Sequence, residues 1–420
     1  MSFYIKTLFY AIPTFMVLIV LEAVVAKAKG VNINRSADVI SSLSSGITNT
    51  IRDAIKFTFA IITYSWLVDH ITVYKLEPYW LAVVVAFLVK DFSGYCVHRL
   101  NHRVNVLWNR HIIHHSSEDF NLSCALRQSI SNTIKFSAVF MIPAALLGVP
   151  ASIFAVMGPI HLFMQLWYHT QMIGKLGPLE YVFVTPSHHR VHHAINPDYI
   201  DKNYGQILII WDKMFGTFQP ELDDVKPVYG TLNQANTWNP ILINFKYVWQ
   251  LIKDAWRAES GLDKIKIWFM PTGWRPGDVS KIYPSEKIKD SSKQIKYNTK
   301  NSSGLIYFCW AQLFFAMVFM FHMFTIIHNT EPLFNYLYAL FIFVSIFSFT
   351  SLLDNSSYSW IAEVCKLVLG LSIIYAQGYS WYNLNGLSIY AVLLIIVGSF
   401  LWFLYFQNDI KRRTLNLSIS

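Results

Sequence analysis

The stretch HRLNHRVNVLWNRHIIHH, residues 98–115, holds five histidines within eighteen positions. It follows directly on YWLAVVVAFLVKDFSGYCV, residues 79–97, an apolar run close to the roughly 20 residues that a membrane-crossing helix needs. His98 and His102 are four positions apart, so on a helix both side chains point to one face. The stretch therefore predicts a membrane helix whose end carries a pair of metal-binding imidazoles.

Two more motifs repeat this density of histidine. HIIHH at 111–115 and HHRVHH at 188–193 share the spacing HxxHH, and a lone histidine stands in the sequence YHT. Nine nitrogen ligands exceed what one ion needs, whereas two ions would take about four or five each and keep positions open for oxygen. Imidazole suits iron, zinc and copper, so the ligand type leaves the metal open. The predicted ligands are His98, His102, His111, His114, His115, His169, His189, His192 and His193.

Other polar residues near the motifs are candidates for orienting the ring N–H groups of the ligands, as acceptors do at many metal sites. Asp91 precedes His98 by seven residues on the same helical stripe, and His161 lies two turns before His169. The remaining candidates flank the second and third motifs: Glu118, Asp119, Asn121, His188, Asp201 and Asn203.

The composition predicts an integral membrane protein, because 54% of the residues are hydrophobic and 16% are aromatic. The formal charge of +9 is spread over loops and helix ends, which does not favour nucleic-acid binding. Gly148 to Pro150 would join the fourth and fifth of nine predicted spans into a hairpin. The spans lie near residues 7–25, 53–72, 78–97, 133–148, 151–170, 305–328, 333–353, 359–377 and 385–406.

The predicted organisation has three parts. Residues 1–284 form a membrane domain with the histidine motifs, residues 285–304 form a polar linker, and residues 305–420 form a four-helix membrane module. The module carries no histidine set and no nucleotide-binding loop, so its role stays open. Basic residues follow the first and third spans and fill the long loop after the fifth, so the histidine side is predicted to be cytoplasmic.

With these motifs, the chain resembles the fatty acid hydroxylase and sterol desaturase superfamily, in which HxxxH, HxxHH, a lone His and HxxHH follow in this order. SSEDFNLS, TPSHHRVHH and PTGWRPG resemble the alkylglycerol monooxygenase branch, and the resemblance covers roughly residues 45–280. It implies an all-α polytopic fold in which a cytosolic cap holds two irons through the nine histidines. It also implies an oxygen-dependent monooxygenase that cleaves the ether bond of an O-alkylglycerol to a fatty aldehyde and glycerol.

The first motif departs from this branch at one position. In the animal relatives HxxxH is followed by an acidic residue tied to tetrahydrobiopterin, whereas this chain has Arg103. A guanidinium cannot accept hydrogen bonds, so the pterin is not carried over, and the electron donor, a reductase or another carrier, stays unidentified. Zinc is expected to compete for the site in purified protein, because it binds such ligands more tightly than ferrous iron.

Three alternatives remain at the level of sequence. A fatty acid or sterol hydroxylase or desaturase would use the same metal site on a different lipid. A metal transporter would need ligands near the bilayer midplane, whereas these motifs lie at the ends of the predicted spans. A zinc hydrolase would need a general base such as the Glu of HExxH, a motif that this sequence lacks.

Overall fold

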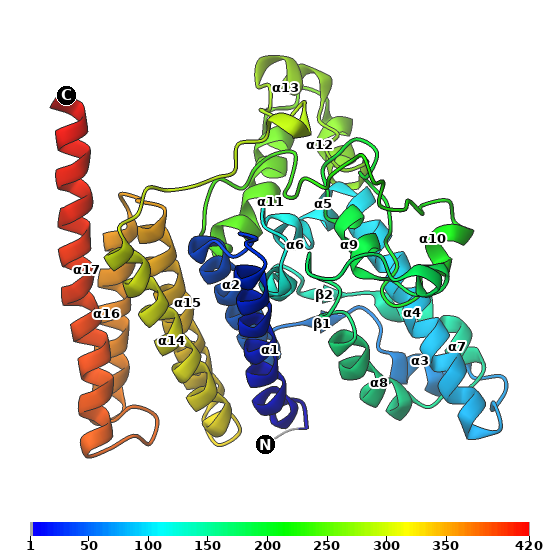
Figure 1. Cartoon of the computed structure of the whole chain (residues 1–420). Helices are drawn as coiled ribbons and strands as arrows, with labels where there is room; N and C mark the ends of the chain where they lie inside the picture. The colour runs from blue at the N-terminus through cyan, green and yellow to red at the C-terminus, as the bar shows by residue number, and fades with distance from the viewer. Residues whose placement is uncertain (1–2, 420) are drawn as a thin grey trace.

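The computed structural model describes the backbone of residues 3–419 and the side chains of residues 5–407. Figure 1 shows long helices running side by side and a loop-rich cap above their ends. Among the described residues, six helices are long and apolar enough to cross a membrane. They are α1 (Phe3–Ala28), α4 (Tyr79–Arg103), α14 (Ser303–Ile326), α15 (Pro332–Leu353), α16 (Ser359–Ala376) and α17 (Leu387–Ile419).

The four C-terminal helices form the predicted membrane module. The apolar spans of these helices begin and end near the bounds expected from the apolar runs. Their core is built from large side chains such as Phe308, Phe341 and Trp381, all fully buried. The same hydrophobic cluster includes residues of α1 and of helix α2 (Ser36–Ala54), so both N-terminal helices pack on this module.

The predicted spans at 53–72, 133–148 and 151–170 are not continuous helices of spanning length. Residues 53–72 contain the end of α2, a positive φ at Lys56, and two short elements. Residues 133–148 are likewise divided into short elements, and the helix in 151–170, α8, ends at Phe163. Chain reversals and local pairing interrupt the helical hydrogen bonds in these apolar segments. The elements are β1 (Phe59–Ala60), α3 (Tyr64–Ile71), β2 (Ile134–Lys135), η2 (Ser137–Met141), α7 (Ile142–Leu146) and α8 (Ala151–Phe163).

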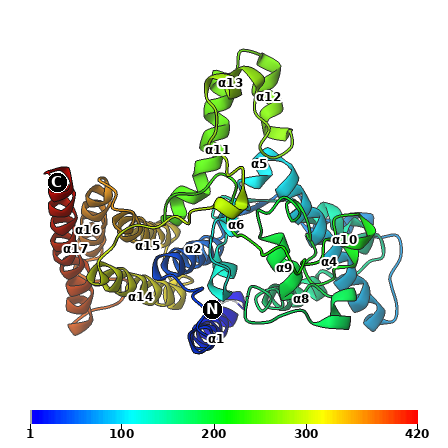
Figure 2. The ribbon, with the colours of Figure 1, turned by 45° about the horizontal axis from the view of Figure 1, so that its top comes forward.

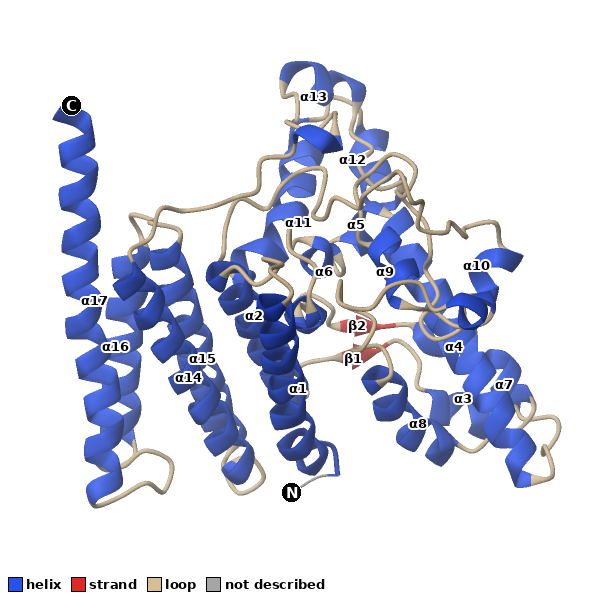
Figure 3. Cartoon of the chain, in the orientation of Figure 1, coloured by secondary structure: helices blue, strands red, loops and turns tan. Residues whose placement is uncertain are grey.

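These short elements nevertheless carry the chain down and back along α4. β1 pairs with β2 in parallel, at the centre of Figure 3, and Leu76 N donates to Leu147 O beside the start of α4. Gly148, with φ +62°, approaches this loop so closely that a Cβ there would lie 2.6 Å from Tyr74 O. The hairpin predicted at Gly148 thus turns tightly at the end of α4 that is remote from the histidines.

The cap is made of short helices and loops. Its helices α11 to α13 project beyond the ends of the spanning helices, as Figure 2 shows. The cap elements are α5 (Asn105–Trp108), α6 (Ile112–His115), η1 (Leu122–Leu126), η3 (Gly177–Tyr181), α9 (Pro186–His192), α10 (Ile210–Met214), α11 (Pro240–Arg257), α12 (Gly261–Phe269), α13 (Gly277–Ile282) and η4 (Ser291–Lys293).

Candidate metal centre

All nine predicted ligands converge at the junction of α4 and the cap. They form two groups in which the candidate ligand atoms lie within 4.8 Å of one another, and every ring except that of His111 is buried. The first group is His98, His102, His111, His115 and His192. The second group is His114, His169, His189 and His193.

The two HxxHH motifs each divide their histidines between the groups. His111 and His115 join the first group while His114 joins the second; His189 and His193 join the second while His192 joins the first. In the third motif, a spacing of four residues along α9 keeps the outer pair on one face of the helix, and the middle histidine points elsewhere. Each motif therefore contributes its outer pair to one group and its middle histidine to the other, and the two motifs do so with the groups exchanged.

The spacing of the imidazole nitrogens fits metal coordination. In the first group His98 Nε2 lies 2.9 Å from His111 Nε2, and in the second group four pairs of Nε2 atoms lie 2.8 to 3.3 Å apart. Bonds of about 2.1 Å predict nitrogens about 3.0 Å apart at an octahedral ion and about 3.4 Å apart at a tetrahedral one. Each group is thus sized to surround a single ion.

Backbone carbonyls set the tautomer of four ligands. A carbonyl can only accept, so the facing Nδ1 must donate, which leaves the lone pair on Nε2 for a metal. His192 Nε2 is buried and has no hydrogen-bond partner among the described side chains, as a ligand atom awaiting a cation would be. The four Nδ1 contacts are His98 with Tyr204 O (2.8 Å), His114 with Arg127 O (3.2 Å), His169 with Gln165 O (3.0 Å) and His192 with Lys202 O (2.9 Å).

Burial keeps the ligands of the cap in the neutral form that binds metal. A neutral imidazole at physiological pH gives up no proton to bind an ion. Burial, with a further contribution from neighbouring histidines, holds the pKa well below the ordinary value at His111, His114, His115, His189, His192 and His193.

A buried ion pair that was not predicted from the sequence supports the second motif. Arg127 Nη2 lies 3.0 Å from Asp38 Oδ2, and both side chains are 2% exposed. The guanidinium also donates to Ser42 Oγ and Ser116 Oγ, so it joins α2 to the end of α6. Because the carbonyl of Arg127 accepts from His114, this network fixes one ligand of the second group.

Glu22 on α1 is another residue that sequence reasoning missed. It is a buried carboxylate within a spanning helix, and it accepts hydrogen bonds from Leu122 N and from Thr170 Oγ1, next to His169. Ionisable residues inside membrane segments are commonly functional. A lone acid in the apolar run of α1 was the signal that could have found it.

Asp91 contacts no predicted ligand directly and instead holds a loop that contacts one. Its buried carboxylate accepts from His161 Nε2, Ile207 N, Leu208 N and Trp211 Nε1, at 2.9 to 3.1 Å. It thereby holds the 204–212 loop, whose Tyr204 carbonyl accepts from His98. The other ring nitrogen of His161, Nδ1, accepts from Gln165 Nε2, and His161 belongs to neither histidine group.

The polar residues after the second motif were expected to orient ligands, but they tie the loop to other segments. Glu118 accepts from Gln234 Nε2 and from Tyr297 N. Asp119 pairs with Arg35 and Lys296, and Asn121 donates to Ile33 O and caps η1. Residue 297 lies in the predicted linker, which therefore packs against the cap.

The candidates beside the third motif also differ from expectation. Asp201 pairs with Arg103 at 2.7 Å, and its other oxygen is 3.9 Å from His102 Nδ1, beyond hydrogen-bond distance. Asn203 donates to His188 O and Gln219 O, which shapes the loop. His188 lies outside both groups although it adjoins His189. Among the described side chains, no predicted carboxylate makes a hydrogen bond to a ligand ring.

The fold and the site together define an integral membrane protein with a histidine-rich metal centre on its cap side. Residues 83–217 match the family model described as fatty acid hydroxylase. This match covers every predicted ligand and indicates an iron site, and the all-histidine donor set fits that metal. No solved structure matches the chain.

Comparison with known proteins gives the family. The chain is 35% identical to alkylglycerol monooxygenase of Homo sapiens over 375 residues, 88% of this chain and 82% of that protein. It is 34% identical to alkylglycerol monooxygenase of Danio rerio over 432 residues, 96% of this chain and 89% of that protein. Ornithine lipid hydroxylase OlsE of Rhizobium tropici is 35% identical over 34% of this chain and 43% of its own length. The chain belongs to the alkylglycerol monooxygenase family, and it is an oxygen-dependent oxidoreductase.

Proposed function

We propose that this protein is a di-iron monooxygenase that hydroxylates the carbon next to the ether oxygen of an O-alkylglycerol. The observation that carries the proposal is the separation of nine histidines into groups of five and four, each spaced for one ion. When bound, two irons would supply the activation of oxygen. Family membership supports the substrate class, because the relatives that match over most of the chain are alkylglycerol monooxygenases.

The proposed reaction balances with one oxygen molecule, two electrons and two protons. One oxygen atom enters the C–H bond beside the ether oxygen, and the other leaves as water. The hemiacetal then collapses: its hydroxyl proton passes to the departing glycerol oxygen, the C–O bond breaks, and a fatty aldehyde and glycerol are released. The residues of this chain contribute the neutral imidazoles, the carbonyls that orient them, and the buried surroundings that exclude water from the site.

We further propose that the histidine site faces the cytoplasm and that the chain crosses the bilayer nine times. Six passes use the long helices, and three use the interrupted segments 53–72, 133–148 and 151–170. Support comes from the turns at Leu76 and Gly148, which meet at the far end of α4. Loops 327–331 and 377–386, on the side opposite the cap, contain no Lys or Arg, as expected outside the cytoplasm.

The electron donor is proposed to be a separate reductase or carrier. Arg103 pairs with Asp201 at the edge of the site and presents only N–H donors there. A pterin that relies on a carboxylate at this position would find none on that side chain. The proposal therefore does not include tetrahydrobiopterin.

Metal analysis and a single turnover test the proposed function. Protein purified without oxygen, loaded with ferrous iron and reduced chemically should hold two irons per chain and release fatty aldehyde from 1-O-hexadecylglycerol. His189→Ala should lose iron and aldehyde formation, whereas His188→Ala, the neighbouring residue outside both groups, should retain iron. Stoichiometric zinc that iron cannot replace, with no oxygen consumed, would contradict the proposal. Oxidation of a free fatty acid but no ether lipid would favour the fatty acid hydroxylase alternative.

A further inference from the structure

Two adjoining cavities connect the ligands with the cap surface. The first, which we call the access cavity, has a volume of about 180 Å³ and is lined by four ligands together with Asp201 and Lys287. The second, which we call the cap pocket, has a volume of about 520 Å³ and lies along α11. The two cavities adjoin, because both are lined by Ile112, Thr231, Leu232, Asn233, Tyr247 and Lys287.

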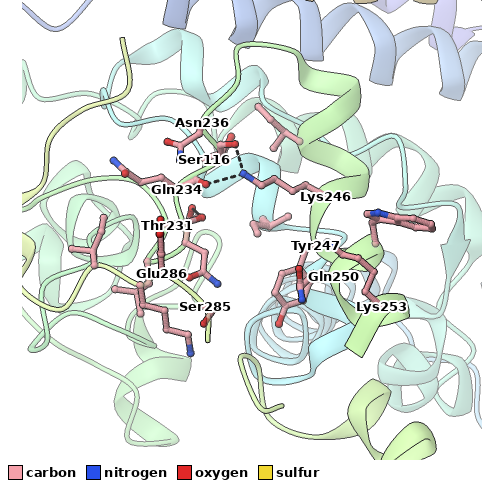
Figure 4. Close-up of a pocket in the computed structure, with 18 residues that line it drawn as sticks. Ser116, Thr231, Gln234, Asn236, Lys246, Tyr247, Gln250, Lys253, Ser285 and Glu286 are labelled. Carbon is pink, nitrogen blue, oxygen red and sulfur yellow. Dashed lines mark hydrogen bonds between the residues drawn. The ribbon is translucent and has the colours of Figure 1, made fainter. Parts of the chain in front are cut away.

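The cap pocket gathers positive charge. Lys246 reaches from α11 toward the segment 231–236 on the opposite wall, as Figure 4 shows. Lys253 lines the pocket from α11, and Lys287 lines both cavities. Glu286 is the acidic residue that lines the pocket. Asp201 in the access cavity is already paired with Arg103. Lysine thus outnumbers unpaired carboxylate along the route.

The polar groups of the pocket are arranged as donors. Lys246 Nζ donates to Gln234 O and Ala235 O, which holds its side chain across the pocket and leaves one N–H for a ligand. Gln250 and Trp249 also line the space. The Gln234 amide already donates to Glu118 Oε1 and Ile295 O, so the lysines are the main donors that remain for a ligand. Ammonium groups form strong charge-assisted hydrogen bonds with phosphate. The donor set therefore suits an anion that carries several acceptor oxygens.

The position of the pocket relates it to the polar end of a lipid. The ligands His98 and His102 stand at the cap end of α4, and the pocket lies along the cap helix α11, which projects beyond the ends of the spanning helices (Figure 2). A lipid whose ether carbon reaches the ligands and whose tail stays in the bilayer must extend its polar head toward the cap. The route through the access cavity leads that head to the lysines.

We propose that the cap pocket binds a phosphate group on the head of the ether lipid, so that the preferred substrate is a 1-O-alkylglycerol phosphate rather than the neutral alkylglycerol. This inference rests on the proposed function, because it assigns the head of the same substrate. Lys287 contacts the phosphate at the junction of the cavities, and Lys246 and Lys253 hold it from α11.

Steady-state kinetics of the full-length, iron-loaded protein test the inference. The ratio of kcat/KM for 1-O-hexadecylglycerol 3-phosphate to that for 1-O-hexadecylglycerol should exceed one. Lys253→Gln and Lys287→Gln should each lower this ratio about five- to tenfold, mainly by raising KM for the phosphate lipid, as expected for loss of a hydrogen bond to a charged group. Lys264→Gln, an exposed lysine of α12 that does not line the pocket, should leave the ratio unchanged.

Each outcome bears on one proposal. A ratio of one or less, or a ratio that all three variants change equally, would overturn the phosphate site while leaving ether oxidation intact. No oxidation of either lipid by the iron-loaded protein would instead overturn the proposed function. Competitive inhibition by glycerol 3-phosphate that weakens in Lys287→Gln would support recognition of the head. Equal inhibition by inorganic phosphate, without preference for the phosphate lipid, would indicate a free-anion site and overturn the inference.

Discussion

The C-terminal module and the metal centre are stabilised in different ways. The module consists of helices of 18 to 33 residues whose large apolar side chains pack in one cluster. The metal centre rests on the end of α4 and on helices of only four and seven residues, α6 and α9, and their ligands His98, His114 and His192 bond to backbone carbonyls outside these helices. Apolar packing tolerates small displacements, whereas ligand geometry depends on each hydrogen bond. Changes in the module should therefore alter stability, and changes around the site should alter metal binding.

A buried ion pair interrupts the apolar packing of the module, and it offers the largest expected effect. Lys366 Nζ lies 2.5 Å from Glu363 Oε1 and also donates to Ser399 Oγ and Gln312 Oε1, all within the four-helix core. Glu363→Ala should lower the free energy of unfolding by about 3–5 kcal/mol, because it leaves a buried charge unpaired. Thermal unfolding in detergent measures the loss, and iron per folded chain should stay unchanged.

The double variant Glu363→Leu with Lys366→Met is the matched control. It removes both charges, so it should lose much less stability than the single variant. If the single variant retained wild-type stability, the ion pair would not support the module. If it lost iron at temperatures where it remains folded, the two regions would be more closely coupled than their packing indicates.

The corresponding change beside the metal centre is Asp91→Asn. The Asp91 carboxylate accepts hydrogen bonds from four donors, whereas the amide of the variant would point an N–H group at one of them. The lost hydrogen bond should destabilise the 204–212 loop by about 2–3 kcal/mol. Because Tyr204 O in this loop orients His98, iron affinity should fall about tenfold. Iron titration checks this against Asp198→Asn, an exposed acid near the third motif. Equal affinities for the two variants would show that Asp91 does not position the ligand.

The same loop should respond to pH through Asp212. Burial raises the pKa of this carboxyl to about 6, although it accepts from Tyr204 N, Gly205 N and Thr217 Oγ1. The folded state therefore holds the proton more tightly than the unfolded state, and this contribution to stability is lost as pH rises from about 4 through about 6. Asp212→Asn should make the fall in unfolding free energy over that range shallower by about 1–3 kcal/mol. A profile parallel to wild type would contradict the prediction.

The smallest effect is expected at Arg103, whose side chain is 54% exposed. Arg103→Glu places a carboxylate opposite Asp201, and at such an exposed site the change in stability should stay below about 1 kcal/mol. Single-turnover aldehyde formation by the wild type should not depend on tetrahydrobiopterin. Arg103→Gln separates loss of charge from its reversal. A pterin-dependent rate in the unaltered protein would show that Arg103 does not prevent use of the pterin.

Long apolar runs were sufficient to predict α1, α4 and the four helices of the module. In the hydrocarbon of a bilayer, a continuous helix is the simplest structure in which all backbone N–H and C=O groups form hydrogen bonds. The serine-rich helix α2 was not predicted, since its buried hydroxyls bond within the protein: Ser42 Oγ donates to Asp38 O. The segment at 53–72 was predicted as a span because it is apolar, yet it breaks at Lys56, whose positive φ ends the helix. Hydropathy records composition and is insensitive to such local reversals.

The sequence by itself determined the nine histidines that meet and the long helices that frame them, because HxxxH and HxxHH impose their geometry within a turn or two of helix. Only the tertiary structure decided which histidine joins which group, since that depends on how α4, α6 and α9 face one another. It also decided that backbone carbonyls such as Tyr204 O, rather than the nearby carboxylates, orient the ligand rings. Every residue has a carbonyl, so the chain's path, and not its residue types, selects the one that a ring will meet.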